Sequence, residues 1–157
     1  MRFAGHVSDR FIGSYTGRDD WLQRTVLGAF ADGELRGAAE CRLLPGNWPQ
    51  EAELAFSVEQ SLQGRGIGSA LFARMLTFAR NRALQRVYLT TLAHNRRMRH
   101  IAGKFGMRLS VCDGDLEGRL ELLGPDYVSL WEEAWQESHG WLASAWHSLL
   151  ADGREAA

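Results

Sequence analysis

The sequence has little cysteine and proline, and it lacks any long apolar run. Cys41 and Cys112 are its only cysteines in 157 residues, and no Cys-x-x-Cys or histidine-rich spacing accompanies them. This composition argues against a disulfide framework or a structural zinc site, so we expect no metal, and a reducing cytoplasm fits best. No apolar stretch approaches the roughly 20 residues of a membrane-spanning helix, and the start of the chain has no apolar signal segment.

An excess of one charge is also missing. The 18 basic and 19 acidic residues leave a formal net charge of -1, so nothing in the overall charge favours nucleic acid or an anionic membrane as a partner. We expect neither. The length suits one core. We expect a domain over residues 1–124 and a C-terminal helical extension over residues 125–157, which holds four of the six tryptophans.

The predicted elements follow the order strand, strand, strand, helix, strand, helix, strand, strand. Apolar periodicity and turn residues such as Asp-Gly predict them. The expected strands are 25–31, 35–44, 53–58, 86–92, 107–111 and 119–123, and the expected helices are 69–83 and 95–105. This order indicates an α/β (α+β) fold with a mixed, mostly antiparallel sheet, a central parallel pair, flanking helices and a C-terminal Trp-rich helix.

A glycine-rich stretch, QGRGIGS, joins the third strand to the first helix. It is not a P-loop, because no Lys followed by Ser or Thr ends it, and it is not a dinucleotide fingerprint, because the third glycine of that pattern is missing. Two readings remain open at this point. The stretch is either a tight turn that binds nothing, or a cradle whose backbone N–H groups bind a pyrophosphate at a helix N-terminus without a metal.

The same stretch resembles the Gln/Arg-x-x-Gly-x-Gly/Ala signature of the GNAT family of N-acetyltransferases. A second resemblance lies downstream, where Asn95 opens the next helix and Lys104-Phe105-Gly106-Met107 closes it. The resemblance extends over about residues 25–123, and the two motifs have the separation that is typical of the family. It implies a GNAT-like sheet with acetyl-CoA as cosubstrate, and it favours the cradle over the empty turn.

The resemblance also implies which residues contact acetyl-CoA. The glycine stretch would hold the pyrophosphate, Asn95 would lie near the pantetheine arm, and the backbone N–H of Val58 would polarise the thioester carbonyl. The full set is Phe56, Val58, Gln63, Gly64, Arg65, Gly66, Ile67, Gly68, Ser69 and Asn95.

A carboxylate on the third strand is the predicted catalytic base. An amine with a pKa near about 10.4 is almost fully protonated at neutral pH and needs a base. Several family members place a carboxylate on this strand, and Glu53 matches that position; Glu51 and Glu59 are nearby alternatives, and a solvated strand-end glutamate is the other reading of Glu53. Many family members also carry a tyrosine acid seven residues after the helix-opening Asn, where this chain has Ala102.

Two functions are consistent with these features. The first is an enzyme that transfers the acetyl group of acetyl-CoA directly to a primary amine, either a small amine or a protein lysine, in a ternary complex. The alternative is a non-catalytic acyl-CoA-binding or protein-interaction module of the same fold, which Ala102 and the short segment before residue 25 favour. The Trp-rich extension is expected to pack on the domain's own sheet, to form a homodimer contact or to bind another protein.

Overall fold

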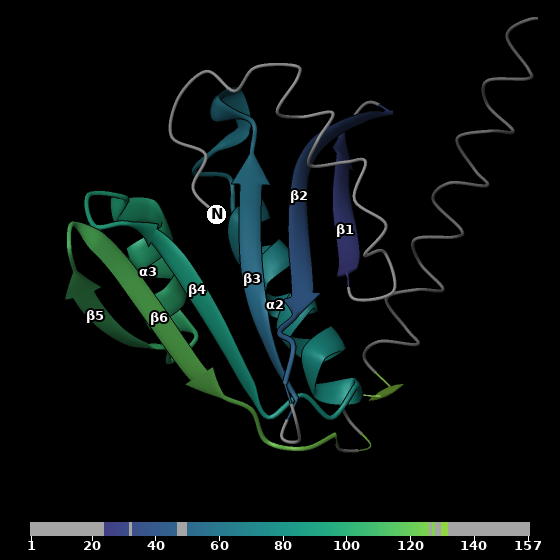
Figure 1. Ribbon diagram of the computed structural model, residues 1–157. Coiled ribbons are helices and arrows are strands. Elements are labelled where there is room, and N and C mark those ends of the chain that lie inside the picture. The colour runs from purple at the N-terminus through teal and green to yellow at the C-terminus, as the bar shows by residue number, and fades with distance from the viewer. Residues whose placement is uncertain (1–23, 32, 47–49, 126, 128–129, 132–157) are drawn as a thin grey trace, which may run out of the picture.

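The computed structural model describes residues 24–31, 33–46, 50–125, 127, 130 and 131. These residues form one twisted sheet with helices behind it, as Figure 1 shows. In chain order the elements are β1 (Arg24–Ala31), β2 (Glu34–Leu43), β3 (Glu51–Val58), the 3-10 turn η2 (Gln60–Leu62), α2 (Ile67–Asn81), β4 (Arg86–Leu92), α3 (Arg96–Lys104), β5 (Arg108–Cys112) and β6 (Asp115–Glu121).

The strand order across the sheet is β1-β2-β3-β4-β6-β5. β3 and β4 pair in parallel, and every other neighbouring pair in this sheet is antiparallel. A parallel pair needs a crossover connection, and α2 supplies it. The predicted fold class, a mixed and mostly antiparallel sheet with a central parallel pair and flanking helices, is confirmed.

The sheet opens between the two parallel strands. Their pairing runs from Glu51–Arg86 to Leu54–Leu89 and then stops, although β3 continues to Val58 and β4 continues to Leu92. Figure 1 shows the two strands diverging beyond this point. The carboxyl-terminal half of β3 therefore has a strand partner on its β2 side only.

The core lies between the sheet and the two helices. α2 packs on β1, β2 and β3, and α3 packs on β5 and on α2. The face of α2 that meets the sheet carries apolar residues at helical spacing, namely Leu71, Phe72, Met75, Leu76 and Ala79. No helix in the described part of the chain is long and apolar enough to cross a bilayer.

Three aromatic rings stack in the centre of this core. Phe72 of α2 lies between Phe56 of β3 and Phe105 after α3, with ring centroids 4.9 Å apart in both pairs and interplanar angles of 18° and 17°. Phe72 is fully buried. The stack ties the open end of β3 to both helices through apolar contact.

α2 ends in a Schellman motif whose left-handed residue is not glycine. Ala83 has φ of 55°, its N–H donates to the carbonyl of Arg80 at 2.9 Å, and the Leu84 N–H donates to the carbonyl of Ala79 at 3.1 Å. Glycine is the usual residue at this position, because a Cβ disfavours the left-handed conformation. Buried Leu84 anchors the motif despite that cost.

The structure shifts some predicted boundaries. β6 begins at Asp115 instead of residue 119, because the turn before it has only two residues, Asp113 and Gly114, both with positive φ. α2 begins at Ile67, since Gly66 is its N-cap. The predicted C-terminal Trp-rich helix lies outside the described residues except at a few positions.

We expect an Ala→Gly substitution to have opposite effects on the free energy of unfolding at the two ends of α2. Ala83→Gly should raise the free energy of unfolding by about 1 kcal/mol, because it relieves the left-handed strain. Ala70→Gly, at an exposed helical position, should lower it by about 0.5–1 kcal/mol. Urea unfolding of both variants checks this, and a loss of stability in Ala83→Gly would contradict it.

Candidate functional site

A cleft of about 820 Å³ lies where β3 and β4 have separated. One wall is the end of β3 with the glycine stretch, and the other is formed by residues 94–98, 100 and 101 at the start of α3. Most of the residues predicted to contact acetyl-CoA line this cleft, and Arg65 and Ile67 do not. Those that do are Phe56, Val58, Gln63, Gly64, Gly66, Gly68, Ser69 and Asn95.

The backbone of β3 faces this cleft with polar groups. The Glu59 N–H donates to the carbonyl of Arg36 on β2 at 2.8 Å. Successive residues of a strand alternate the side to which their N–H and C=O point. Phe56 and Val58 therefore point away from β2, towards the space that β4 has left, and no strand in the described part of the chain pairs with them there.

The glycine stretch presents further backbone donors. Gly64 and Gly66 have φ of 80° and 87°, a conformation in which side chains are strained. The first backbone hydrogen bond of α2 runs from the Ala70 N–H to the Gly66 carbonyl at 2.9 Å. The N–H groups of residues 67–69 therefore have no acceptor within the helix, and no acidic side chain lies in its first turn. Such a helix start favours an anion.

Gly68 is required for a different reason. A Cβ at this position would lie 3.1 Å from Cδ1 of Ile101 on α3. The two helices approach each other closely here, so the missing side chain provides space and not backbone freedom.

The side chain of Gln63 is engaged with the protein. Its Nε2 donates to the carbonyl of Val58 at 2.9 Å, and its Oε1 accepts a hydrogen bond of 2.5 Å from Nη1 of Arg97. The sequence predicted Gln63 as a contact to acetyl-CoA. That role stays a prediction; in this structure the Gln63 carboxamide joins the two walls of the cleft.

Asn95 is the N-cap of α3. Its Oδ1 accepts from the Met98 N–H at 3.1 Å, and its Nδ2 donates to Oγ1 of Thr91 at 3.0 Å. An Asn at this position satisfies one of the free N–H groups at the helix start. Asn95 thereby fixes the start of α3 against the end of β4, and it also lines the cleft.

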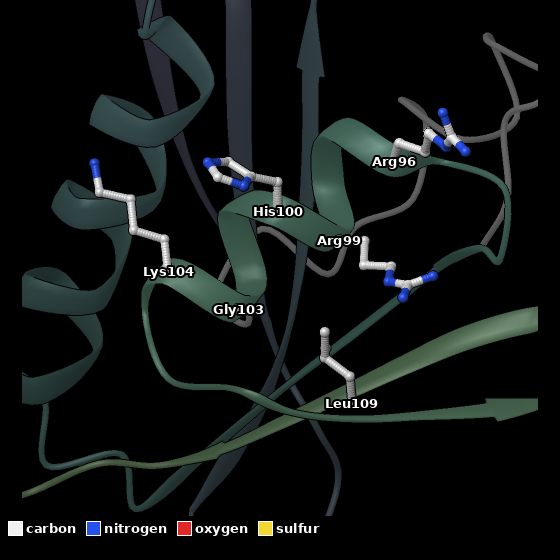
Figure 2. A pocket seen from close by; sticks show the side chains of 6 residues that line it. All are labelled: Arg96, Arg99, His100, Gly103, Lys104 and Leu109. Carbon is white, nitrogen blue, oxygen red and sulfur yellow. The ribbon is translucent and has the colours of Figure 1, made fainter.

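A second hollow, of about 510 Å³, lies on the outer face of α3. Figure 2 shows that its basic side chains do not converge: Arg96 and Arg99 extend to one side, and His100 and Lys104 extend to the other. Arg96 and His100 also line the cleft. This arrangement does not enclose a small anion, but Arg96 adds positive charge to the cleft, which favours a polyanionic ligand.

The model of the acetyltransferase (GNAT) family matches residues 6–107. The chain belongs to this family. Membership implies acyl transfer from acetyl-CoA.

Solved structures support the assignment. The GNAT domain of S. lividans PAT is 27% identical, with a TM-score of 0.63, and the match covers 74% of this chain and 70% of that chain. Two others share the fold. Ribosomal-protein-alanine N-acetyltransferase from Brucella melitensis is 20% identical with a TM-score of 0.61, and the match covers 74% of this chain and 80% of that chain. PaiA N-acetyltransferase from Thermoplasma acidophilum, solved with coenzyme A, is 19% identical with a TM-score of 0.57, and the match covers 72% of this chain and 67% of that chain.

Glu53, the predicted base, lies on β3 outside the cleft lining. It shares a strand face with Ser57, as predicted, and its Oε2 accepts a hydrogen bond of 2.6 Å from Nη2 of Arg42. Partial burial alone would raise the pKa of Glu53, but the hydrogen bond and charge of Arg42 help to hold that pKa below its usual range. Glu53 is therefore ionised at neutral pH.

The two alternative carboxylates are also paired. Glu51 accepts hydrogen bonds from Arg86 and, at 3.0 Å, from the hydroxyl of Tyr88. Glu59 accepts from Arg36 and Ser61, both at 2.8 Å, and these contacts lower its pKa. Among the described residues, no group of three or more His, Cys, Asp or Glu side chains is arranged to hold a metal.

Several cleft residues were not singled out from the sequence. Ser57, Leu62, Met98 and Ile101 all line the cleft. The helical spacing of Met98 and Ile101 after Asn95 was a usable signal, because residues three apart share a helix face. Leu62 had no such signal, since it lies on the 3-10 turn η2.

Removing Arg42 should make stability less dependent on pH. A carboxylate with a lowered folded pKa stabilises the protein above its unfolded pKa, near about 4.3, and this contribution is lost as the pH falls through the folded pKa. Arg42→Met should therefore cost about 1 kcal/mol at pH 7, and this cost should shrink below about pH 4. Urea unfolding of wild type and variant, once at pH 7 and once below about pH 4, measures this cost.

The control for this experiment is Arg119→Met. Arg119 pairs with Glu121 at 2.9 Å, with side chains 47% and 61% exposed, and such exposed pairs contribute little. A cost for Arg42→Met that is equal at both pH values would contradict the assigned role of Arg42.

Proposed function

We propose that this GNAT domain transfers the acetyl group of acetyl-CoA directly to a primary amine, a small amine or a protein lysine, within a ternary complex. One observation carries the proposal: a single cleft has open strand backbone at one end and an anion-binding helix start at the other. A pantetheine arm has amides that pair with open strand backbone, and a pyrophosphate is the anion that follows it.

Chain residues would divide the binding between them. The N–H groups at the start of α2, with the backbone at Gly64 and Gly66, would bind the pyrophosphate. The backbone of Phe56 would bind the arm, and the Val58 N–H would donate to the thioester oxygen as negative charge develops on it. Acetyl-CoA supplies an acyl group activated by a thiol leaving group, whose pKa near about 8.5 makes it depart readily.

Glu53 is the base of this proposal. Arg42 helps to keep it ionised, and it shares the strand face of Ser57, which lines the cleft. Four residues of strand span about 13 Å, so the proton would reach Glu53 through water. Ala102 is fully buried and offers no acid, and the hydroxyl of Tyr88 donates to Glu51, so neither residue would protonate the departing thiolate.

Gly66→Ala should weaken coenzyme A binding at least tenfold. A Cβ at φ of 87° meets no atom within 4 Å, but it costs about 1–2 kcal/mol in this conformation, and relaxation would turn the loop N–H groups away. Gly33→Ala is the matched control, since Gly33 has φ of 75° and equal space in a distant hairpin. Calorimetric titration with coenzyme A should show a change in the first variant only. Equal affinity in both would count against the loop as the pyrophosphate site.

Glu53→Gln should lower kcat/KM for the amine about 100-fold, at the lower end of what a positioned base contributes. The assay follows coenzyme A thiol release with pools of amines, peptides and aminoglycosides. Glu121→Gln, an exposed carboxylate on the same sheet face, is the control. Lys104 is the only lysine of the chain, which keeps background self-acetylation of side chains to one site.

The outcomes separate the two functions. Equal rates in wild type and Glu53→Gln would remove Glu53 as the base and leave the transferase in place. No thiol release with any acceptor, together with measurable acetyl-CoA binding, would overturn the transferase and favour the non-catalytic acyl-CoA-binding module.

A further inference from the structure

The two walls of the cleft are held together by few contacts. Strand pairing between β3 and β4 ends at Leu54–Leu89, so backbone hydrogen bonds do not fix the distance between the walls beyond that point. The Phe56–Phe72–Phe105 stack joins them at the base. In the described part of the chain, the side-chain hydrogen bond that crosses between the walls is the one from Arg97 to Gln63.

This hydrogen bond continues to the backbone at the end of β3. Gln63 Nε2 donates to the Val58 carbonyl at 2.9 Å, and the N–H of the same peptide group, which belongs to Glu59, donates to the Arg36 carbonyl at 2.8 Å. A peptide group is planar, so holding both of its polar atoms fixes its orientation. This peptide group directly follows the one that carries the Val58 N–H, so holding it restrains the backbone on the carboxyl side of Val58.

Arg97 determines which way round the Gln63 carboxamide lies. A guanidinium only donates hydrogen bonds, and a backbone carbonyl only accepts them. With Arg97 on one side and the Val58 carbonyl on the other, Oε1 must face Arg97 and Nε2 must face Val58. Without Arg97, Oε1 loses this partner, and the hydrogen bond to the Val58 carbonyl alone would hold the carboxamide in place.

We propose that Arg97 is a positioning residue for acyl transfer, which acts through Gln63 to orient the Val58 N–H. This proposal rests on the proposed function, in which that N–H meets the thioester oxygen. Arg97 is exposed at the rim, where solvent and salt screen its charge. Its contribution is therefore to kcat through orientation, and not to coenzyme A affinity through charge.

A double-mutant cycle tests the connection. Arg97→Met and Gln63→Met should each lower kcat about tenfold. The double variant should be no slower than either single variant, because both substitutions break the same hydrogen-bond connection from Arg97 through Gln63 to the Val58 carbonyl. In each of these variants, the Kd for coenzyme A should stay within threefold of the wild-type value, both at 50 mM and at 300 mM salt. Arg99→Met, which removes a guanidinium from the same helix outside the cleft lining, should leave kcat and Kd at wild-type values.

The proposal would be overturned if the fold-loss of kcat in the double variant equalled the product of the fold-losses in the two single variants. A salt-dependent rise in Kd for Arg97→Met with unchanged kcat would also overturn it, because Arg97 would then contact the ligand's phosphates directly.

An NMR measurement keeps the proposal testable if no acceptor is acetylated. In the free protein, the side-chain NH₂ signals of Gln63 and the amide signal of Val58 should shift in Arg97→Met and stay unchanged in Arg99→Met. Absence of turnover with these shifts present would defeat the proposed function alone. Unchanged signals in Arg97→Met would defeat the positioning role alone.

Discussion

The separation of β3 from β4 after Leu54 and Leu89 is the constraint on which the rest of the structure depends. If the pairing continued, the backbone groups of Phe56 and Val58 would be satisfied inside the sheet, and the cleft would not exist. Because it stops, no strand in the described part of the chain pairs with these groups, and backbone polar groups away from water need other partners. Gln63 supplies one partner, for the Val58 carbonyl, and a bound ligand with amides of its own would supply others.

The two faces of the sheet are stabilised in different ways, and the site uses both. The rear face is apolar and close-packed against α2 and α3, so the walls of the cleft start from a rigid base. The front face carries ion pairs, three of them between neighbouring strands (Arg24–Glu40, Arg42–Glu53 and Arg86–Glu51) and one within β6 (Arg119–Glu121). Among these pairs, Arg42 helps to hold the pKa of Glu53 below its usual range, and a carboxylate with a lowered pKa is a weak proton acceptor.

Much of the fold could be predicted, because apolar periodicity and turn residues act locally. The glycine stretch and Asn95 were placed correctly at the two helix starts for the same reason. The opening of the sheet could not be predicted, since any residue type at Phe56 or Val58 supplies the same backbone groups. The partner of Gln63 could not be predicted either, because Arg97 lies 34 residues away and only the folded chain brings the two together.

The open side of β3 is also a strand edge, although β3 lies inside the sheet and not at its margin. Sheet edges recruit foreign strands, and proteins usually blunt them with charge, proline or cover. Here the cofactor would do this, taking the place of a missing strand as a donated peptide does in strand complementation. A molecule bound along β3 would thus also block the pairing of a foreign strand at this position.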